Sequence, residues 1–306
     1  MIVVFGSIHA DMTFSVPALP GPGETVLGAG YQVFPGGKGA NQALAARRAG
    51  GEVAMAGAVG NDSFSVVALS LLEASGVVLS GVLETPSATG IAAIIVDGKG
   101  ENQIAVASGA NTAANPRHLE SLVSAGDILL LQSELPYDAV VGAASIGRRR
   151  GARVFLNAAP AGPISDVFAT LVDVLIVNEH EAAAIASSMA LPSKPQEFAI
   201  SYSQRWCAIA VVTLGADGAI AASKSEWVKI QAPMVNVVDS TGAGDTFVGT
   251  LAVLFAEGAS LADAVTYAVA AGSLAVERSG AQPSIPDRPA IESRVALMKE
   301  ARARQA

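Results

Sequence analysis

Between residues 52 and 232 the sequence alternates short apolar runs with longer, less apolar segments, and this alternation constrains the fold more than any other feature. The apolar runs, which we predict to be strands, cover 53–59, 128–132, 154–157, 174–177 and 208–213. The segments between them, which we predict to be helices, cover 63–75, 115–125, 137–150, 179–189 and 195–205. Strands that alternate with helices predict an α/β fold of three layers, in which a mostly parallel central sheet has helices on both faces.

The composition supports this fold class and argues against several kinds of partner. Of the 306 residues, 51% are hydrophobic and 15% are charged, as expected when central strands are covered on both sides. The net charge is −8 and the only basic tract, 148–150, ends a predicted helix, so we expect neither nucleic acid nor an anionic membrane as a partner. No apolar segment approaches a membrane span of about 20 residues and the chain opens without a basic leader, which predicts a soluble cytoplasmic protein.

Cys207 is the only cysteine, which excludes an intramolecular disulfide. It begins the apolar run 207–212. We therefore predict a buried thiol in the core rather than a nucleophile.

Two stretches outside the alternating pattern have the composition of β-structure. The first, 17–39, is rich in Pro and Gly, and its segment 26–34 is able to pair as short strands. In the second, two apolar runs flank the turn Asp97-Gly98-Lys99-Gly100, a strong hairpin signal. We predict one domain over residues 1–306, with a small β-sheet lid built from about 11–37 and 89–107 above the active site.

Polar residues follow the predicted strands, at the edge where parallel sheets bind ligands. After the first strand, at 2–6, come His9 and Asp11, which either contact a substrate or merely form a turn. The polar residues after the later strands are Glu134, Asn157, Asn178 with Glu181, and Thr213 with Gly215. Each alone is an ordinary cap or turn residue, but their shared placement predicts a ligand cleft.

The segment 35–42 reads Pro-Gly-Gly-Lys-Gly-Ala-Asn-Gln and leads into an Ala-rich helix. Its glycines, including Gly37, allow the backbone to approach a ligand closely, while Lys38 and Asn41 supply donors at the start of the helix. It is not a Walker A loop, because that motif needs a glycine where this chain has Gln32, and Ser or Thr where it has Gly39.

A second glycine-rich segment, 238–249, marks a helix start that suits an anion. Gly242, Ala243 and Gly244 precede an apolar helical segment, so unpaired N–H groups and the positive end of the helix dipole face the same point. Asp245 falls in the first turn, where the dipole favours its ionised form. A carboxylate beside an anion hole is the arrangement that a general base for a hydroxyl nucleophile requires.

Both glycine-rich segments, about 200 residues apart, resemble signatures of the ribokinase-like (PfkB) carbohydrate kinases. Segment 36–42 resembles the amino-terminal signature of that family and segment 239–247 the carboxyl-terminal one. Further family-like matches are found at 60–64, 178–181 and 280–284, so the resemblance covers essentially the whole chain. It implies a kinase that uses ATP and Mg²⁺ to phosphorylate a hydroxymethyl group of a furanose sugar, most simply the ribose 5-hydroxyl.

The resemblance also implies a role for each candidate residue. Asp245 would be the base, and the backbone of residues 242–245 the anion hole. The sugar would be held by His9, Asp11, Gly37, Lys38, Asn41, Glu134 and Asp245. The nucleotide, its phosphates and the water shell of magnesium would be served by Asn178, Glu181, Thr213, Gly215 and Gly244, with Glu181 reaching the metal through water. A monovalent cation, usually K⁺, would be held by Asp239, Thr241, Ala275, Arg278, Gly280 and Ser284. A homodimer formed through the lid sheet is a further expectation from the family.

One position departs from the pattern of the family. The first strand of a ribose-specific member ends in Gly-Ser-x-Asn-x-Asp, and His9 replaces the Asn here. A neutral imidazole has one donor and one acceptor, whereas an amide has two donors and an acceptor. His9 therefore leaves open another furanose, or a nucleoside whose ribose occupies the same site.

Two other classes of function fit less well. A sensor that binds sugar or nucleotide without catalysis would not need Asp245, Lys38 and Asn41 together. A dehydrogenase would need Gly-x-Gly-x-x-Gly after a strand, and the third glycine position after Gly242 is occupied by Phe247.

Overall fold

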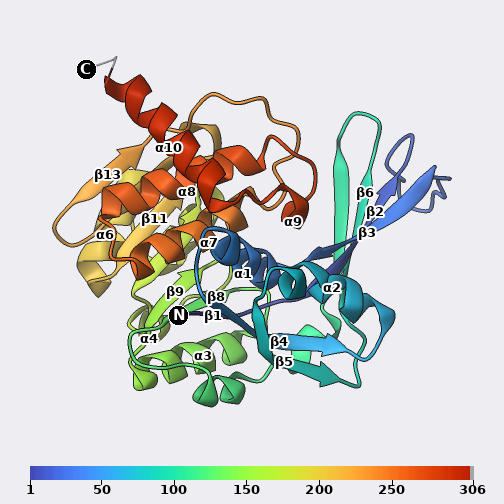
Figure 1. Cartoon of the computed structure of the whole chain (residues 1–306), viewed down its shortest axis with the longest axis horizontal. Coiled ribbons are helices and arrows are strands. Elements are labelled where there is room, and N and C mark those ends of the chain that lie inside the picture. The colour runs from blue at the N-terminus through green and yellow to red at the C-terminus, as the bar shows by residue number, and fades with distance from the viewer. Residues whose placement is uncertain (304–306) are drawn as a thin grey trace.

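The computed structural model of the chain describes residues 1–303, and its main feature is one large, mostly parallel β-sheet (Figure 1). In spatial order its nine strands are β13 (Trp227–Ile230), β12 (Ala219–Ala222), β11 (Ile209–Thr213), β10 (Val174–Asn178), β9 (Arg153–Asn157), β8 (Ile128–Gln132), β1 (Ile2–Phe5), β4 (Val53–Gly60) and β5 (Val78–Thr85). Only β12 and β13, at one edge, run antiparallel to their neighbours. The carboxyl ends of the parallel strands therefore meet along one edge of the sheet.

Helices cover both faces of this sheet, as the three-layer prediction requires. One face is covered by α1 (Lys38–Arg48), α2 (Ser63–Ala74), α7 (Ala243–Ala256), α8 (Leu261–Ala275) and α10 (Arg288–Ala303). The other is covered by α3 (Tyr137–Arg150), α4 (Asp166–Ala169), α5 (Glu179–Met189) and α6 (Pro195–Trp206), together with the 3₁₀ helices at Gly109–Ala113 and Pro116–Ser121. The remaining short helices are a 3₁₀ turn at Gly215–Asp217 and α9 (Ala281–Ser284). The predicted fold class is confirmed.

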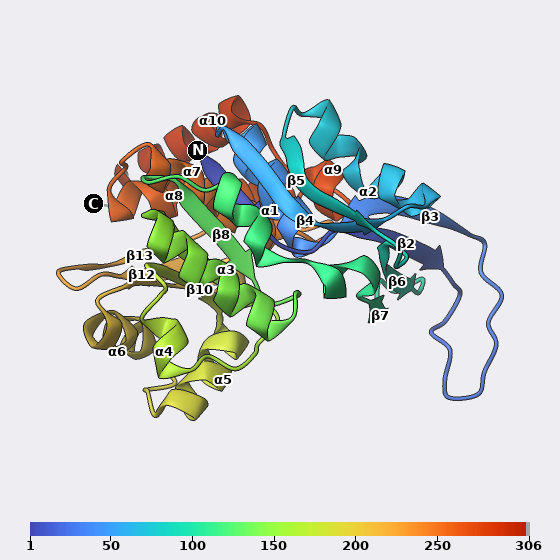
Figure 2. The same cartoon turned by 90° about the horizontal axis from the view of Figure 1, so that it is seen from below.

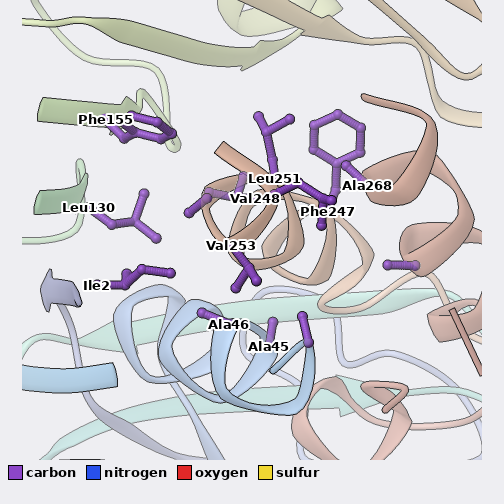
Figure 3. Close-up of a cluster of buried hydrophobic side chains, with 14 of the residues drawn as sticks. Ile2, Ala45, Ala46, Leu130, Phe155, Phe247, Val248, Leu251, Val253 and Ala268 are labelled. Atoms are coloured by element: carbon purple, nitrogen blue, oxygen red, sulfur yellow. The ribbon is translucent and has the colours of Figure 1, made fainter. Parts of the chain in front are cut away.

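The core on the first face is built around α7, whose apolar sequence leaves residues 245–255 buried on all sides. Figure 3 shows Val248, Leu251 and Val253 of α7 between sheet residues such as Ile2 and small side chains of α1 such as Ala45. A Cβ on Gly249 would lie 2.6 Å from the carbonyl oxygen of Gln42, so only glycine permits this approach of α7 to α1. This packing brings the two glycine-rich segments of the sequence together.

A second, four-stranded sheet extends away from the main body (Figures 1 and 2). Its strand order is β3 (Gly30–Gly36), β2 (His9–Ser15), β6 (Gly90–Val96) and β7 (Asn102–Ala107). The predicted hairpin joins β6 to β7, and the Asp97 carboxylate fixes its turn by accepting bonds from the N–H groups of Lys99 (2.8 Å) and Glu101 (3.0 Å). We call these four strands the lid sheet.

Several local predictions were wrong. Residues 115–125 form a short 3₁₀ helix at Pro116–Ser121 rather than an α-helix, and the strand expected over 26–34 begins only at Gly30. Cys207 is exposed, because it ends α6 in a left-handed conformation (φ 55°) and the buried strand begins two residues later. The sequence analysis also missed β2, β5, β12 and β13 as strands. No helix within residues 1–303 is both long enough and apolar enough to cross a membrane.

Candidate active site

Asp245 lies in the first turn of α7 at the carboxyl edge of the sheet and is almost fully buried. Its Oδ2 accepts a hydrogen bond from Nδ2 of Asn41 and its Oδ1 one from Nε2 of Gln42, both at 2.9 Å. Burial raises the pKa of Asp245, and the charge of Lys38 and the two amide donors oppose that rise. The carboxylate is thus held by the helix that begins with the other glycine-rich segment.

The backbone before Asp245 forms an open helix terminus. Gly242 is the N-cap of α7 and has φ 76°, a left-handed conformation that suits glycine. Within residues 1–303, the N–H groups of Gly244 and Asp245 have no hydrogen-bond acceptor, while that of Ala243 makes a long bond of 3.3 Å to the carbonyl of Ser240. Unpaired N–H groups at the positive end of a helix dipole form a site for an anion.

A second set of polar groups surrounds the start of α1. The Glu134 carboxylate accepts bonds from the backbone N–H of Lys38 (3.0 Å) and from the Ser7 hydroxyl (2.5 Å), so it caps the helix from the end of β8. Ser7 in turn accepts a bond from the N–H of Gly39 at 3.3 Å. Gly37 is the N-cap of α1, and the next residue, Lys38, interacts electrostatically with the Glu134 carboxylate.

Lys38 and the carboxylates around it interact electrostatically, and these include both predicted sugar-binding residues and Asp245. Attraction to Asp245, and then to Glu134 and Glu181, raises the pKa of Lys38 against the opposing effect of burial. Burial, followed by repulsion from Glu134 and Asp245, raises the pKa of Asp11 to about 7. The structure therefore brings Asp11, Lys38, Glu134 and Asp245 into one electrostatic cluster.

His9 and Asp11 lie at the root of the lid sheet, where β2 leaves the main body. His9 is buried, and burial lowers its pKa more than Glu134 raises it, so the imidazole is neutral at pH 7. A Cβ on Gly90, in the neighbouring strand, would lie 2.4 Å from Cδ2 of His9. Asn111 fixes the same turn, because its amide bonds both the N–H and the carbonyl of Ile8 at 2.9 Å.

On the other side of the helix terminus is a cavity of about 560 Å³. Its lining is largely apolar and includes Thr213, Gly215, Val235, Ala243, Gly244 and Phe247. The predicted nucleotide residues Thr213, Gly215 and Gly244 therefore lie around one cavity that reaches the open N–H groups. Asn178 and Glu181 are not among its lining residues.

Asn178 and Glu181 form a capping box at the start of α5. Each donates its backbone N–H to the side chain of the other at 2.8 Å. Burial raises the pKa of Glu181, and the bond from Asn178 and the charge of Lys38 oppose this. A structural role thus accompanies the predicted role of Glu181 near magnesium.

The residues predicted to bind a cation form a junction of two loops. The Asp239 carboxylate accepts bonds from the N–H groups of Thr241 (2.9 Å) and Gly280 (2.8 Å). Burial alone would raise the pKa of Asp239, but these hydrogen bonds outweigh it and lower the pKa, which keeps the carboxylate ionised. Arg278 and Ser284 border a separate cavity of about 350 Å³, and Ala275 ends α8 beside them.

The model of the pfkB family of carbohydrate kinases matches residues 1–288. The chain belongs to this family. Within the pfkB family it is 36% identical to a ribokinase of Haemophilus influenzae over 94% of this chain and 95% of that one. The crystal structure of a Thermotoga maritima ribokinase superimposes with a TM-score of 0.90, at 33% identity over 96% of this chain and 99% of that chain. An Arabidopsis thaliana ribokinase complexed with ribose and ATP has a TM-score of 0.86, at 30% identity over 96% of this chain and 98% of that chain.

Membership of the pfkB family confirms the resemblance seen in the two glycine-rich segments. The chain is an ATP-dependent carbohydrate kinase of the ribokinase type. Sequence reasoning missed three members of its site, namely Ser7, Gln42 and Gln132. Gln132 had one usable signal, since it is the only amide in the apolar run 128–132, whereas Gln42 follows the polar Asn41 and had no such signal.

Proposed function

We propose that this kinase transfers the γ-phosphoryl group of ATP to the 5-hydroxyl of D-ribose, with Asp245 as the general base. The observation that carries the proposal is the position of the buried Asp245 carboxylate beside the open helix terminus of α7, whose residues Ala243 and Gly244 line the 560 Å³ cavity. The relative from Arabidopsis that was crystallised with ribose and ATP supports the choice of both substrates.

Asp245 takes part in the reaction through both its side-chain carboxylate and its backbone N–H. The carboxylate takes the proton from the sugar hydroxyl while the hydroxyl oxygen forms a bond to the γ-phosphorus. The bond between that phosphorus and the bridging oxygen then breaks, and ADP leaves. The N–H groups of Gly244 and Asp245 stabilise the negative charge on the transferring group, which is the main catalytic term in phosphoryl transfer.

The sugar is bound by the cluster at the root of the lid sheet. Glu134 and Asp11 supply acceptors for sugar hydroxyls, and Lys38, Asn41 and the backbone at Gly37 supply donors. This assignment is supported by their shared electrostatic environment with Asp245. Polar groups that converge in a water-excluded site fix the orientation of a polyhydroxyl substrate.

The nucleotide occupies the largely apolar cavity bordered by Thr213, Gly215 and Gly244. Glu181 would hold a water of the magnesium ion that accompanies ATP, and Asn178 would lie near the phosphates. The donor set fits a hydrated Mg²⁺, because that ion keeps most of its waters and takes few protein carboxylates. Magnesium supplies charge neutralisation on the phosphates.

A monovalent cation, K⁺, would be held where the loops at 239–241 and 278–284 meet. Asp239 fits this role, since hydrogen bonds keep it ionised and tie both loops together. Its companions are Thr241, Ala275, Arg278, Gly280 and Ser284, several through backbone carbonyls. An ion held there would supply positive charge that fixes the loop leading to Gly242. Replacing KCl by LiCl or choline chloride is therefore expected to lower kcat, and equal rates in all three salts would contradict the site.

A nucleoside kinase is the second candidate, and His9 is the observation that favours it. The neutral, buried imidazole stands where an amide is expected and presents one donor and one acceptor to the sugar. A bulkier group at this point changes which hydroxyls are satisfied, and so admits a nucleoside ribose in the same cleft.

We further propose that the enzyme forms a homodimer through the lid sheet. All of β7 is exposed, including the apolar side chains of Ile104 and Val106, and Tyr31 of β3 is exposed as well. Apolar side chains on an uncovered sheet are typical of an interface between proteins.

The base is tested by Asp245→Asn. We expect kcat to fall by roughly 10²- to 10⁴-fold while the Kd values for ribose and ATP change little, because the amide keeps the shape and loses the proton acceptor. Isothermal titration calorimetry and a coupled ADP assay measure the two quantities. Near-normal turnover by this variant would sink the assignment.

A further inference from the structure

Three buried amide side chains form a chain of hydrogen bonds beneath the carboxylate of Asp245. They come from three different elements, with Gln42 on α1, Gln132 at the end of β8 and Asn157 at the end of β9. Nε2 of Gln42 donates to Oδ1 of Asp245 and to Oδ1 of Asn157, both at 2.9 Å. Nε2 of Gln132 donates to Oε1 of Gln42 at 2.7 Å. We call these three residues the amide relay.

A backbone group sets the direction of every bond in the amide relay. Nδ2 of Asn157 donates to the carbonyl of Ile176 at 3.1 Å, and a carbonyl can only accept. The Oδ1 of Asn157 must therefore face Gln42, which turns the NH₂ of Gln42 toward Asp245. Both protons of that NH₂ are then used, one on Asn157 and one on Asp245. The arrangement is satisfied only when Oδ1 of Asp245 carries no proton.

We infer that Gln42, oriented by Asn157 and Gln132, is a positioning residue that holds the Asp245 carboxylate ionised and in one rotamer for proton abstraction. This inference rests on the proposed role of Asp245 as the base. It assigns Gln42 a task different from that of its neighbour Asn41, which donates to the other oxygen, Oδ2, and which we place in contact with the sugar.

The burial of Gln42 supports an indirect role. Its side chain has no exposed surface, and it does not line either cavity. The backbone of Gln42 lies directly against α7 at Gly249. This contact fixes the position of Gln42 relative to Asp245, which lies on the same helix α7. A buried polar side chain is costly unless its own polar atoms are hydrogen-bonded, and both donors and the acceptor of Gln42 are.

Loss of this donor has a defined chemical signature. A hydrogen bond to the charged form of a group lowers the pKa of an acid, so its removal raises the pKa of Asp245. Less of the enzyme then carries an ionised base at the acidic end of the pH range. The acid limb of the kcat/KM profile must move to higher pH, while the KM for ATP, which binds beyond the helix terminus, stays the same.

The first test compares Gln42→Leu with the wild-type enzyme. We expect kcat at pH 7 to fall about 10-fold or more and the acid limb to move up by about one pH unit, as the loss of one charge-assisted hydrogen bond predicts. Ser203→Ala is the matched control, because it removes an equally buried bond, to the carbonyl of Ala222 at 2.7 Å, between α6 and β12. That control should lower the Tm without moving the pH profile.

Gln42→Glu serves if Gln42→Leu does not fold, since it keeps the shape of the side chain. A carboxylate facing Asp245 should move the acid limb further up than Leu does, because like charges raise the pKa of the pair. A pH profile that coincides with that of the wild type in either folded variant would overturn the inference.

A double-mutant cycle tests whether the relay acts through Gln42. Asn157→Leu should shift the acid limb in the same direction, and Gln42→Leu combined with Asn157→Leu should shift it no further than Gln42→Leu alone. Additive shifts would contradict the relay. Asp245→Asn separates the two proposals, since an active Asp245→Asn enzyme refutes the base itself, whereas an inactive one beside a normal Gln42→Leu enzyme refutes only the role of Gln42.

Discussion

The central strands of the main sheet and the edge strand β7 of the lid sheet are of similar length but opposite burial. Every residue of β1, β4 and β8 in the main sheet is buried, whereas every residue of β7 in the lid sheet is exposed. The strand β2 joins the two regions, and its burial falls from His9 at the root to Ser15 at the tip. The base belongs to the buried region, and His9 and Asp11 lie at the transition.

This difference in burial suggests that the two regions have different functions. A rigid, close-packed region can hold Asp245 and its donors within the narrow tolerance that proton and phosphoryl transfer require. The root of the lid sheet can accept changes in sugar contacts, as His9 illustrates. The tip can change without consequence for either. Substitutions in the main body, at the root and at the tip should therefore have effects of decreasing size on turnover.

Apart from Asp245 itself, the largest effect is expected in the main body, at Gly242. Gly242→Ala places a side chain on a left-handed residue and its Cβ 2.9 Å from Cα of Ala281. We expect a loss of about 1–3 kcal/mol in the free energy of unfolding, and a fall in kcat of roughly 10²-fold because the anion hole moves. Urea unfolding and steady-state kinetics measure both.

Gly244→Ala is the matched control for stability. A Cβ at this position meets no atom within 4 Å, and the residue has an ordinary helical conformation. Alanine should therefore stabilise the helix by about 0.5–1 kcal/mol. Equal destabilisation by the two substitutions would show that the loop is not as closely packed as the structure indicates.

An intermediate effect is expected at the root, at Asp11. Its pKa in the folded protein is raised to about 7, so between about pH 4 and pH 7 the native state binds more protons than the unfolded state. Stability must then fall as pH rises through this window. Asp11→Asn removes the titration, and at pH 8 it should be more stable than the wild type by about 1 kcal/mol, or roughly 2 °C in Tm, while the KM for sugar rises.

Thermal unfolding from pH 4 to pH 8 checks this sign. The difference in Tm between Asp11→Asn and the wild type should increase with pH and level off above pH 7. A difference that is the same at every pH would mean that Asp11 titrates normally, and would remove it from the cluster around Lys38.

The smallest effect on turnover is expected at the tip, for Ile104→Asp. The side chain is exposed, so neither the fold nor kcat should change by more than about two-fold. The proposed dimer should dissociate at micromolar concentration, because a charge would face an apolar surface. Light scattering after size-exclusion chromatography measures the mass, and Gly98→Asp in the exposed hairpin turn is the charge-matched control, since a Cβ there meets no atom within 4 Å.

The sequence predicted the central strands of the main sheet better than β5, β12 and β13 at its edges, for physical reasons. Long buried strands and helices leave a strong periodic pattern, so β8, α3 and the polar residues after the strands were all found. In β2 (His9–Ser15) polar and apolar residues do alternate, a strand signal that we missed because the segment directly follows the first strand and its polar residues were also interpreted as a turn. Its pairing to β3 and β6 depends on later segments of the chain. Cys207 was misplaced because a helix ends there in a left-handed residue that apolar periodicity does not reveal.

The same holds for the candidate site, where only residues with a local sequence signal could be predicted. The glycine-rich segments identified Asp245, Lys38 and Asn41, because such motifs carry their chemistry locally. The partner of Oδ1, Gln42, could not be predicted, since its role follows from the contact of α1 with α7 and from the carbonyl of Ile176. The raised pKa of Asp11 on β2 likewise depends on Glu134 and Asp245, which lie far from it in the sequence.

The most direct test of the account is a phosphotransfer panel with γ-labelled ATP, Mg²⁺ and K⁺. The acceptors are ribose, 2-deoxyribose, fructose, ketohexose phosphates, adenosine, inosine and pseudouridine, and ³¹P NMR identifies the phosphorylated position. The account predicts the highest kcat/KM for ribose, with ribose 5-phosphate as the product. A higher kcat/KM for a nucleoside would favour the alternative raised by His9, and release of phosphate from ATP without transfer to any sugar would contradict the central claim.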